Sequence, residues 1–410
     1  MTHPTRRAFC LSAAAAVALL RHPAAAQSRS STHPDVAAID HDRIFAAAAI
    51  ALDTPITPLT TLPAPRTVGT PHDFYSEPED FFPDPAGGAN PWVRRPGATN
   101  PDSFAAHRNA VYQLGVAVAA LTTASVVTSD PKYAARAAEH LRAWFITPGT
   151  RMNPTLQLAQ RVPNTATGRP EGIIETVPLS EVARSLRFLA AYDALTAEDL
   201  AAIRKWFADY ALWLSESRTA GLARDMKDHN GSSWLLQSAA YADANVIGLS
   251  SDDATLNTLR HRFHTVTLRA QMNAYGNFPR EVSTPTPYRN SLFNLDLLTV
   301  ACELLTTRFD NPWEYELQDG PGIRSTIAYH YPYILSPSTW PYPADASHFK
   351  ELPGRRISLL LAGRAYSRPE YVDLWKSLSP LPPTAAPELL RSFPVTQPLL
   401  WATKPKLTPS

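Results

Sequence analysis

Cysteine is scarce in this chain, which has only Cys10 and Cys302 among its 410 residues. Cys10 falls in an N-terminal export signal, so Cys302 is left alone and no intrachain disulfide can form. Histidines and acidic residues do not stand at the spacing of a zinc site, and a nucleophile elbow, a Walker loop and a Rossmann fingerprint are all missing. We therefore expect no metal and no cofactor.

An excess of charge of one sign is also missing, because 38 basic residues face 37 acidic ones and the formal net charge is +1. A nucleic-acid-binding domain normally carries an excess of basic residues, so we do not expect nucleic acid as a partner. Long apolar runs are lacking as well. The run from Leu11 to Leu20 is far shorter than the roughly 20 residues that cross a bilayer, and no later segment is expected to span a membrane.

The N-terminus has the features of an export signal. Arg6-Arg7-Ala8-Phe9 is a twin-arginine start, and Ala24-Ala25-Ala26 forms a small-residue cleavage site. Residues 1–26 are thus predicted to be a twin-arginine signal peptide, and residues 27–410 a single domain that is periplasmic or secreted. Removal of the signal peptide takes away three arginines and no acidic residue, and leaves a formal net charge of −2. A polyanion would then have to bind in a local cationic groove.

Helical periodicity dominates the chain from Ser103 to Thr307. Apolar residues recur at spacings of three, four and seven in seven segments, which are 103–127, 131–146, 178–195, 197–218, 232–247, 253–274 and 291–309. Two short helices are expected at about 355–366 and 368–378, and strand signals are few. Successive antiparallel helix pairs predict an all-α fold, an incomplete α/α toroid.

Segments rich in proline and aromatic residues flank these helices. Residues 52–102 cannot form regular helix because of their prolines, and we expect them to wrap over one face of the toroid. Residues 319–354 are predicted to be a second irregular aromatic stretch, and a proline-rich tail ends the chain.

The most informative segment is Lys227-Asp228-His229-Asn230-Gly231, just before an apolar helix. The His229 imidazole and the Asn230 amide can both donate to one carboxylate, and the positive end of the helix favours an anion. Lys227 adds a cation for substrate binding. The alternative is an ordinary N-cap by Asp228 or Asn230 beside a surface histidine.

A second group comes later, at Arg280 and at Tyr288-Arg289. Arg280 is expected in a stiff loop where it can bind an anion, Tyr288 offers a phenol for proton transfer, and Arg289 offers a further cation. The alternative is that Arg280 pairs with Glu281 or another surface acid and that Tyr288 packs on the next helix.

Further candidates for sugar binding lie in the irregular segments. The connection from 151 to 176 is unusually long for a helical fold, and long loops in compact domains are commonly functional. The aromatic and arginine side chains of 52–102 can stack on a sugar ring or pair with a uronate. These candidates are Tyr75, Arg94, Arg95, Asn153, Gln160, Arg161 and Arg169.

Several motifs stand in a fixed order between about 74 and 300. They are Phe74-Tyr75-Ser76-Glu77, Arg94-Arg95-x-Gly97-x-Thr99-Asn100-Pro101-Asp102, Met152-Asn153-Pro154 with Gly168-Arg169, and Phe278-Pro279-Arg280-Glu281 with Ser291-Leu292-Phe293-Asn294. Together they resemble the alginate lyase superfamily. The resemblance implies an α/α toroid lyase that cleaves polyuronates such as alginate or glucuronan, with an acidic polysaccharide as its partner.

The resemblance also implies residue roles. In similar enzymes an Asn, a His and an Arg bind the substrate carboxylate and a Tyr moves the protons, which by position are Asn230, His229, Arg280 and Tyr288. The chain departs from the family pattern at one segment: the family usually has Asn-Asn-His-Gly, and this chain has Asp228-His229-Asn230-Gly231. It departs again after the Pro-Tyr pair, where the family often has a second tyrosine and this chain has Asn290.

β-Elimination removes the C5 proton next to a carboxylate, and donors at the carboxylate oxygens stabilise the charge that develops. Tyr288 is the expected base or acid, with its pKa lowered by Arg280 and Arg289, and His229 is an alternative base. Two other functions are alternatives: a non-catalytic uronate-binding protein, or a glycoside hydrolase on the same fold, for which the candidate carboxylates are Asp80, Glu175 and Glu281.

Overall fold

The computed structural model describes residues 31–88, 91–246, 253–345 and 347–405. These described residues form one compact unit. The predicted signal peptide, residues 1–26, lies outside the described residues.

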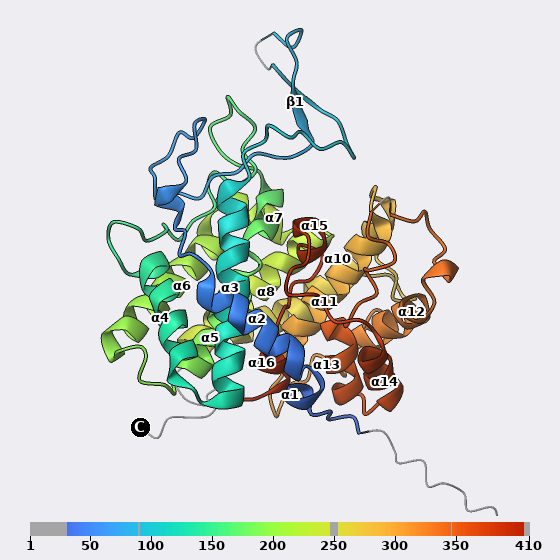
Figure 1. Cartoon of the computed structure of the whole chain (residues 1–410). Coiled ribbons are helices and arrows are strands. Elements are labelled where there is room, and N and C mark those ends of the chain that lie inside the picture. Colours follow the sequence, from blue (N-terminus) through green and yellow to red (C-terminus); the bar gives the residue numbers. More distant parts are fainter. Residues whose placement is uncertain (1–30, 89–90, 247–252, 346, 406–410) are drawn as a thin grey trace, which may run out of the picture. The chain divides into compact units, whose positions relative to one another are not determined.

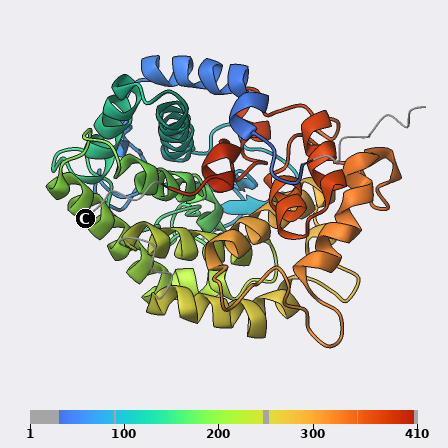
Figure 2. The same ribbon diagram turned by 90° about the horizontal axis from the view of Figure 1, so that it is seen from below.

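The described unit is an α/α toroid built of successive helices that run up and down (Figures 1 and 2). Its longer helices are α2 (His41–Asp53), α3 (Ala106–Thr128), α4 (Pro131–Phe145), α5 (Leu179–Leu189), α6 (Ala197–Glu216), α8 (His229–Asn245), α9 (Ala254–Arg262), α11 (Pro287–Leu305), α12 (Ile323–Leu335), α13 (Ile357–Ala365) and α14 (Pro369–Ser377). Short helices are α1 (Val36–Ile39), α7 (Arg218–Arg224), α10 (Leu268–Gln271), α15 (Pro387–Leu390) and α16 (Pro398–Ala402). Single turns of 3-10 helix lie at Leu59–Thr61, Glu281–Ser283 and Pro337–Thr339, a longer 3-10 segment lies at Pro170–Thr176, and Phe263–Thr267 is a π-helix.

An inner layer of helices is buried on nearly all faces. Most residues of α3, α5, α8, α11 and α13 are buried, as expected where neighbours pack on both sides. α3 corrects one expectation, because by length and hydropathy it would suffice to cross a membrane. However, 78% of its apolar window is buried inside the protein, so it is a core helix.

The outer helices are amphipathic and start where the sequence predicts. Asp130 accepts a hydrogen bond from the Lys132 N–H and Pro131 fills the first position of α4, an arrangement that needs no N–H from proline. Thr196 and Asp199 form a capping box at the start of α6, which satisfies two backbone donors. These helices shield the inner layer from water on one side.

The predicted irregular segment 52–102 is largely irregular and carries a small hairpin. β1 (Phe81–Pro83) pairs with β2 (Trp92–Arg94) in antiparallel register, with Phe82 opposite Val93. The hairpin projects at the top of Figure 1. Its two ends, near Asp80 and Gly97, lead back to the toroid, and this position makes them part of the candidate site described below.

The prediction that 319–354 is irregular is wrong for α12, Ile323–Leu335. The aromatic residues and Pro332 hid its period, yet Ile327, His330 and Ile334 are buried on one face. A proline in a helix removes one backbone hydrogen bond, and Pro332 does so only in the last turn, where its own carbonyl still accepts from the Ser336 N–H. The helices α1 and α2 were likewise not expected from the sequence.

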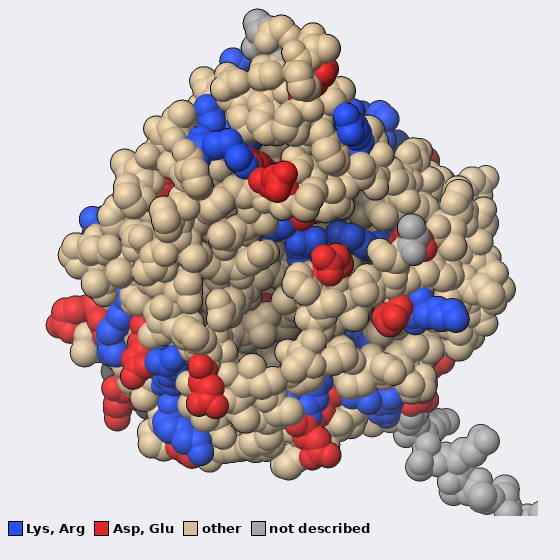
Figure 3. Space-filling model, turned by 45° about the horizontal axis from the view of Figure 1, so that its top comes forward, with Lys and Arg blue, Asp and Glu red and all other residues tan. Residues whose placement is uncertain are grey.

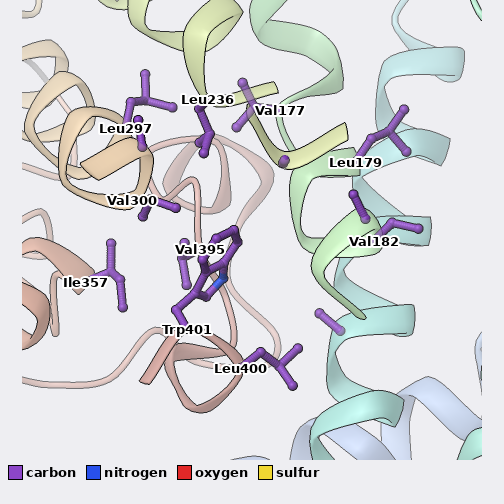
Figure 4. Close-up of a cluster of buried hydrophobic side chains, with 14 of the residues drawn as sticks. Val177, Leu179, Val182, Leu236, Leu297, Val300, Ile357, Val395, Leu400 and Trp401 are labelled. Atoms are coloured by element: carbon purple, nitrogen blue, oxygen red, sulfur yellow. The ribbon is translucent and has the colours of Figure 1, made fainter. Parts of the chain in front are cut away.

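The C-terminal tail contributes to the interior rather than trailing over the surface. Val395 and Trp401 lie among side chains of the inner helices, including Leu236 of α8 and Val300 of α11 (Figure 4). Trp401 is 1% exposed. We call residues 387–402 the C-terminal plug, because they fill space enclosed by the inner helices.

Candidate active site

A cavity of about 300 Å³ opens between the inner helices and the base of the hairpin. Lys and Arg side chains gather around a hollow on this face (Figure 3). The cavity walls come from the irregular segment 52–102, α3, the 3-10 segment Pro170–Thr176, α8, α11 and the C-terminal plug. The polar residues that line it are Glu79, Asp80, Thr99, Arg108, Tyr112, Gln160, Glu175, His229, Arg289, Asn290 and Arg391.

The N-terminus of α8 is occupied by the protein's own carboxylates. Asp228 is the N-cap and accepts hydrogen bonds from the backbone N–H and the side-chain amide of Asn230, at 2.9 and 3.0 Å. Glu281 accepts from the His229 backbone N–H at 2.5 Å. These donors therefore have partners within the protein, and binding of a substrate anion at this helix end stays a prediction.

Glu281 also fixes the His229 ring. The Glu281 carboxylate lies 2.9 Å from His229 Nδ1 and is fully buried. Because an ionised carboxylate only accepts, Nδ1 carries the proton and the lone pair of the neutral ring is on Nε2. His229 lines the cavity and its side chain is 16% exposed. The imidazole is thus held in one tautomer at the cavity wall.

The same pair sets the pKa of His229. Burial alone would lower this pKa, but the charge and hydrogen bond of Glu281, aided by Asp228, outweigh burial and raise it. A carboxylate beside a buried histidine favours the imidazolium form. His229 therefore loses its proton at a higher pH than an unperturbed histidine does.

The close approach of α8 to the preceding loop requires a glycine. A Cβ at Gly231 would lie 2.2 Å from the backbone oxygen of Met226, a distance that no side chain tolerates. This contact sets where the first turn of α8, and therefore His229, sits.

Three guanidinium groups face the cavity. Arg108 donates to Glu79 at 2.6 Å and lies 3.7 Å from Glu175. Arg391 lies 3.5 Å from Glu79. Within the described residues, the Arg289 side chain makes neither a hydrogen bond nor an ion pair, and burial together with the charge of Arg391 lowers its pKa. An unpaired guanidinium next to a like charge creates a binding site for an anion.

The phenol in the cavity wall is Tyr112, from α3. Burial raises the pKa of Tyr112 to about 12, while Arg391 and Arg108 act in the opposite direction. In the described part of the chain its hydroxyl has no hydrogen-bond partner, so it is available to a ligand. A phenol with such a pKa is a proton donor at neutral pH.

The pKa values of two acidic residues in the cavity, Glu175 and Glu79, are shifted in opposite directions. Burial raises the pKa of Glu175, which accepts a hydrogen bond from Ser76. Burial would also raise the pKa of Glu79, but Arg108 and Arg391 lower it below the usual range. Gln160 sits beside them in a left-handed conformation with φ of 47°, which a non-glycine residue adopts only when its surroundings hold it there.

Three residues predicted to be catalytic lie outside the cavity. Tyr288 is buried in the core, donates to the Tyr333 carbonyl at 2.9 Å and packs on Trp340. Burial raises its pKa, so the predicted lowering by Arg280 and Arg289 is wrong. Arg280 is exposed on the loop before Glu281, and Asn230 is held by its N-cap. Only His229 of the predicted catalytic set reaches the cavity.

The predicted substrate-binding residues divide in the same way. Gln160 and Arg289 line the cavity. The other candidates do not line this cavity. Their contacts are as follows: Tyr75 donates to Glu77, Arg94 pairs with Asp80 at the cavity edge, Arg95 stacks on Phe82, Asn153 donates to Asp73, Arg161 donates to the Arg66 carbonyl, Arg169 pairs with Glu171, and Lys227 is exposed beside another cavity. Among the described residues, no group of His, Cys, Asp or Glu is placed to hold a metal ion.

Sequence reasoning missed Arg108, Tyr112 and Arg391. Arg108 lies shortly after the Arg94–Asp102 motif, and its position next to that motif could have marked it as a candidate. Tyr112 lies on α3, where its apolar neighbours suggest only a core position. Arg391 belongs to a proline-rich tail without a motif, so only the three-dimensional structure connects it with the site.

Comparisons with known proteins identify the family and the fold. The profile of the family described as Alginate lyase matches residues 60–340. An alginate lyase from Bacteroides ovatus is similar in structure, with 24% identity, a TM-score of 0.75, and coverage of 86% of this chain and 93% of that one. Alginate lyase A1-III from Sphingomonas species A1 has 15% identity, a TM-score of 0.51, and coverage of 88% and 95%.

A variant of alginate lyase A1-III complexed with a tetrasaccharide also matches, with 14% identity, a TM-score of 0.50, and coverage of 88% and 94%. No curated protein sequence matches significantly. The two solved lyases establish the α/α toroid, and the family profile spans more than half of the chain. This chain therefore belongs to the Alginate lyase family.

Proposed function

We propose that this protein cleaves a polymer of uronic acids by β-elimination and leaves a 4,5-unsaturated uronate at the new end. One observation carries the proposal: a single cavity joins an oriented imidazole, a phenol and guanidinium groups. Elimination next to a carboxylate needs a base, an acid and cations, and these are the groups present.

The substrate carboxylate binds at Arg289. This guanidinium faces the cavity and lacks a partner among the described residues. Pairing the carboxylate with a cation stabilises the enolate-like state more than the ground state, because negative charge grows on those oxygens during proton removal. Loss of one such donor typically costs about 10²–10³ in rate.

His229 Nε2 removes the C5 proton, and Tyr112 donates its proton to the departing O4. The electron pair of the C5–H bond forms the C4=C5 double bond as the C4–O bond breaks. Imidazolium and phenolate then return to their starting states by proton exchange with water. The pKa of Tyr112, which burial raises to about 12, supports its role as the acid, because the phenol is protonated at neutral pH.

Hydrolysis fits the cavity less well. It would need two carboxylates free to act on the glycosidic bond. Glu79 is bound to Arg108, Asp80 is bound to Arg94, and Glu281 is buried against His229. Burial raises the pKa of Glu175, but a single acid without a partner carboxylate does not complete that mechanism.

The experiment is an elimination assay on a panel of polyuronates that includes alginate and glucuronan, followed by ultraviolet absorbance of the unsaturated product. The matched negative substrate is the same polymer with its carboxylates reduced to alcohols. We expect absorbance to rise with at least one polyuronate and with none of the reduced polymers. Absorbance that stays flat on every polyuronate would refute the proposal.

A further inference from the structure

We propose that Arg391, carried by the C-terminal plug, binds the substrate carboxylates together with Arg289 and so belongs to the substrate-binding site. This inference rests on the proposed function, because it assigns a further residue to the same cavity. Arg391 lies beyond residues 60–340, the part of the chain that the family profile matches. The site is thus completed by a segment that the family motifs do not contain.

The plug is held firmly enough to place a side chain. Buried Glu181 accepts hydrogen bonds from the backbone N–H groups of Thr396 and Gln397, at 2.8 and 3.0 Å. Fully buried Arg356 donates to the Ser392 carbonyl, next to Arg391, at 2.6 Å. Below these contacts, Val395 and Trp401 pack among the inner helices (Figure 4). A site on a rigid support keeps its geometry.

Arg391 is not needed to neutralise its neighbour in the protein. Glu79 already accepts a hydrogen bond from Arg108 at 2.6 Å, whereas Arg391 stands off at 3.5 Å and makes no hydrogen bond to it. The Arg391 side chain is 16% exposed, and it lines the cavity. A guanidinium with most of its five donors unused can still bind an incoming carboxylate.

The two arginines act on each other and on the phenol. Arg391 is the neighbouring charge that contributes most to lowering the pKa of Arg289 and to opposing the raised pKa of Tyr112. The two like charges that line the cavity repel each other when it holds no ligand. A uronate carboxylate placed between them removes that repulsion, so the pair is suited to an anionic ligand and unsuited to a neutral sugar.

The test compares Arg391→Gln and Arg391→Lys with the wild-type protein. The charge-matched control is Arg368→Gln, which breaks an exposed pair with Glu370 outside the cavity. The measurements are kcat and KM on the polyuronate that gives the highest elimination rate, the salt dependence of KM, and the melting temperature.

We expect Arg391→Gln to raise KM by about 10- to 100-fold, as for a lost hydrogen bond between charged groups, with a weaker salt dependence. Arg391→Lys should raise KM less than Arg391→Gln does, because lysine keeps the positive charge but lacks the two parallel N–H donors of the guanidinium group. Arg368→Gln should have a KM within about twofold of the wild-type value and a similar melting temperature, because exposed ion pairs contribute little to stability. A merely structural role of Arg391 would lower the melting temperature without changing the salt dependence.

The outcomes separate the two claims. If the wild-type protein eliminates and Arg391→Gln keeps the KM and salt dependence of the control, the inference is overturned while the proposed function stands. If the wild-type protein eliminates no polyuronate, both fall. Should Arg391→Gln fail to fold, Arg391→Lys decides: an unchanged KM and salt dependence overturn the inference, and a raised KM supports it.

Discussion

Glu281 is expected to control both the tautomer and the pKa of His229, and Glu281→Gln tests this. The wild-type carboxylate accepts from the His229 backbone N–H and from Nδ1. It raises the pKa of His229 against the effect of burial. If neutral His229 is the base, wild-type activity rises with pH as the imidazolium loses its proton, and this rising limb lies above the ordinary histidine pKa of about 6.5.

In Glu281→Gln the charge is gone and burial remains, so the pKa of His229 falls and the rising limb moves to lower pH. The glutamine amide can also turn its NH₂ toward Nδ1 and favour the wrong tautomer. We therefore expect kcat/KM on the plateau to fall by about 10²–10⁴, the usual contribution of an oriented general base. The lost hydrogen bond to a charged group costs about 1.5–3 kcal/mol of stability.

Linkage fixes the pH dependence of that stability. Because the folded pKa of His229 is raised, its contribution is fully present below the unfolded pKa and is lost as pH rises through the folded pKa. The stability difference between wild type and Glu281→Gln should therefore be largest on the acidic side of this window. Thermal melts at a series of pH values measure it.

Asp345→Asn is the matched control, because Asp345 also accepts two backbone N–H groups, at the start of α11. It should lose stability and keep the wild-type position of the rising limb. The assay is initial elimination rate against pH for the three proteins. A rising limb at the same pH in wild type and Glu281→Gln would refute the assignment of His229 as the base.

Three further substitutions test other parts of the site. Tyr112→Phe should lower kcat by about 10²–10⁴ without changing the melting temperature, and a kcat equal to wild type would contradict its role as the acid. Tyr288→Phe should keep kcat but lose about 0.5–1.5 kcal/mol of stability, because its bond to the Tyr333 carbonyl is structural. Gly231→Ala should lower both melting temperature and kcat, since its Cβ would press on the Met226 oxygen, and unchanged values of both would show that the first turn of α8 has room to move.

The sequence predicts the toroid well where local signals are strong. α4 and α6 begin at the first residues of the predicted segments, 131 and 197, because Asp130, Pro131 and Thr196 satisfy or remove backbone donors locally. α12 was missed because tyrosines and Pro332 stand between its buried residues Ile327, His330 and Ile334, which obscures the 3.6-residue period. Burial by neighbouring helices stabilises it, and such tertiary contacts leave no local signature.

For the candidate site, the sequence predicts the kinds of side chain better than it predicts which residues supply them. The Asp-His-Asn-Gly segment and the loop at Glu281 were recognised, but their interaction spans 52 positions and reverses their roles: Glu281 takes the helix end, and His229 turns to the cavity. Tyr288 and Arg289 are adjacent in sequence, yet the helix period sends one into the core and the other into the cavity. Arg391 reaches the site only through the packing of the plug.

The central claim is that the cavity catalyses elimination, and the most direct measurement is the number of unsaturated ends formed for each new reducing end. Both are counted in one reaction with a polyuronate, by ultraviolet absorbance and by a reducing-sugar assay. Elimination at O4 predicts equal numbers of the two kinds of end throughout the reaction. New reducing ends without unsaturated ends would mean hydrolysis and would contradict the account.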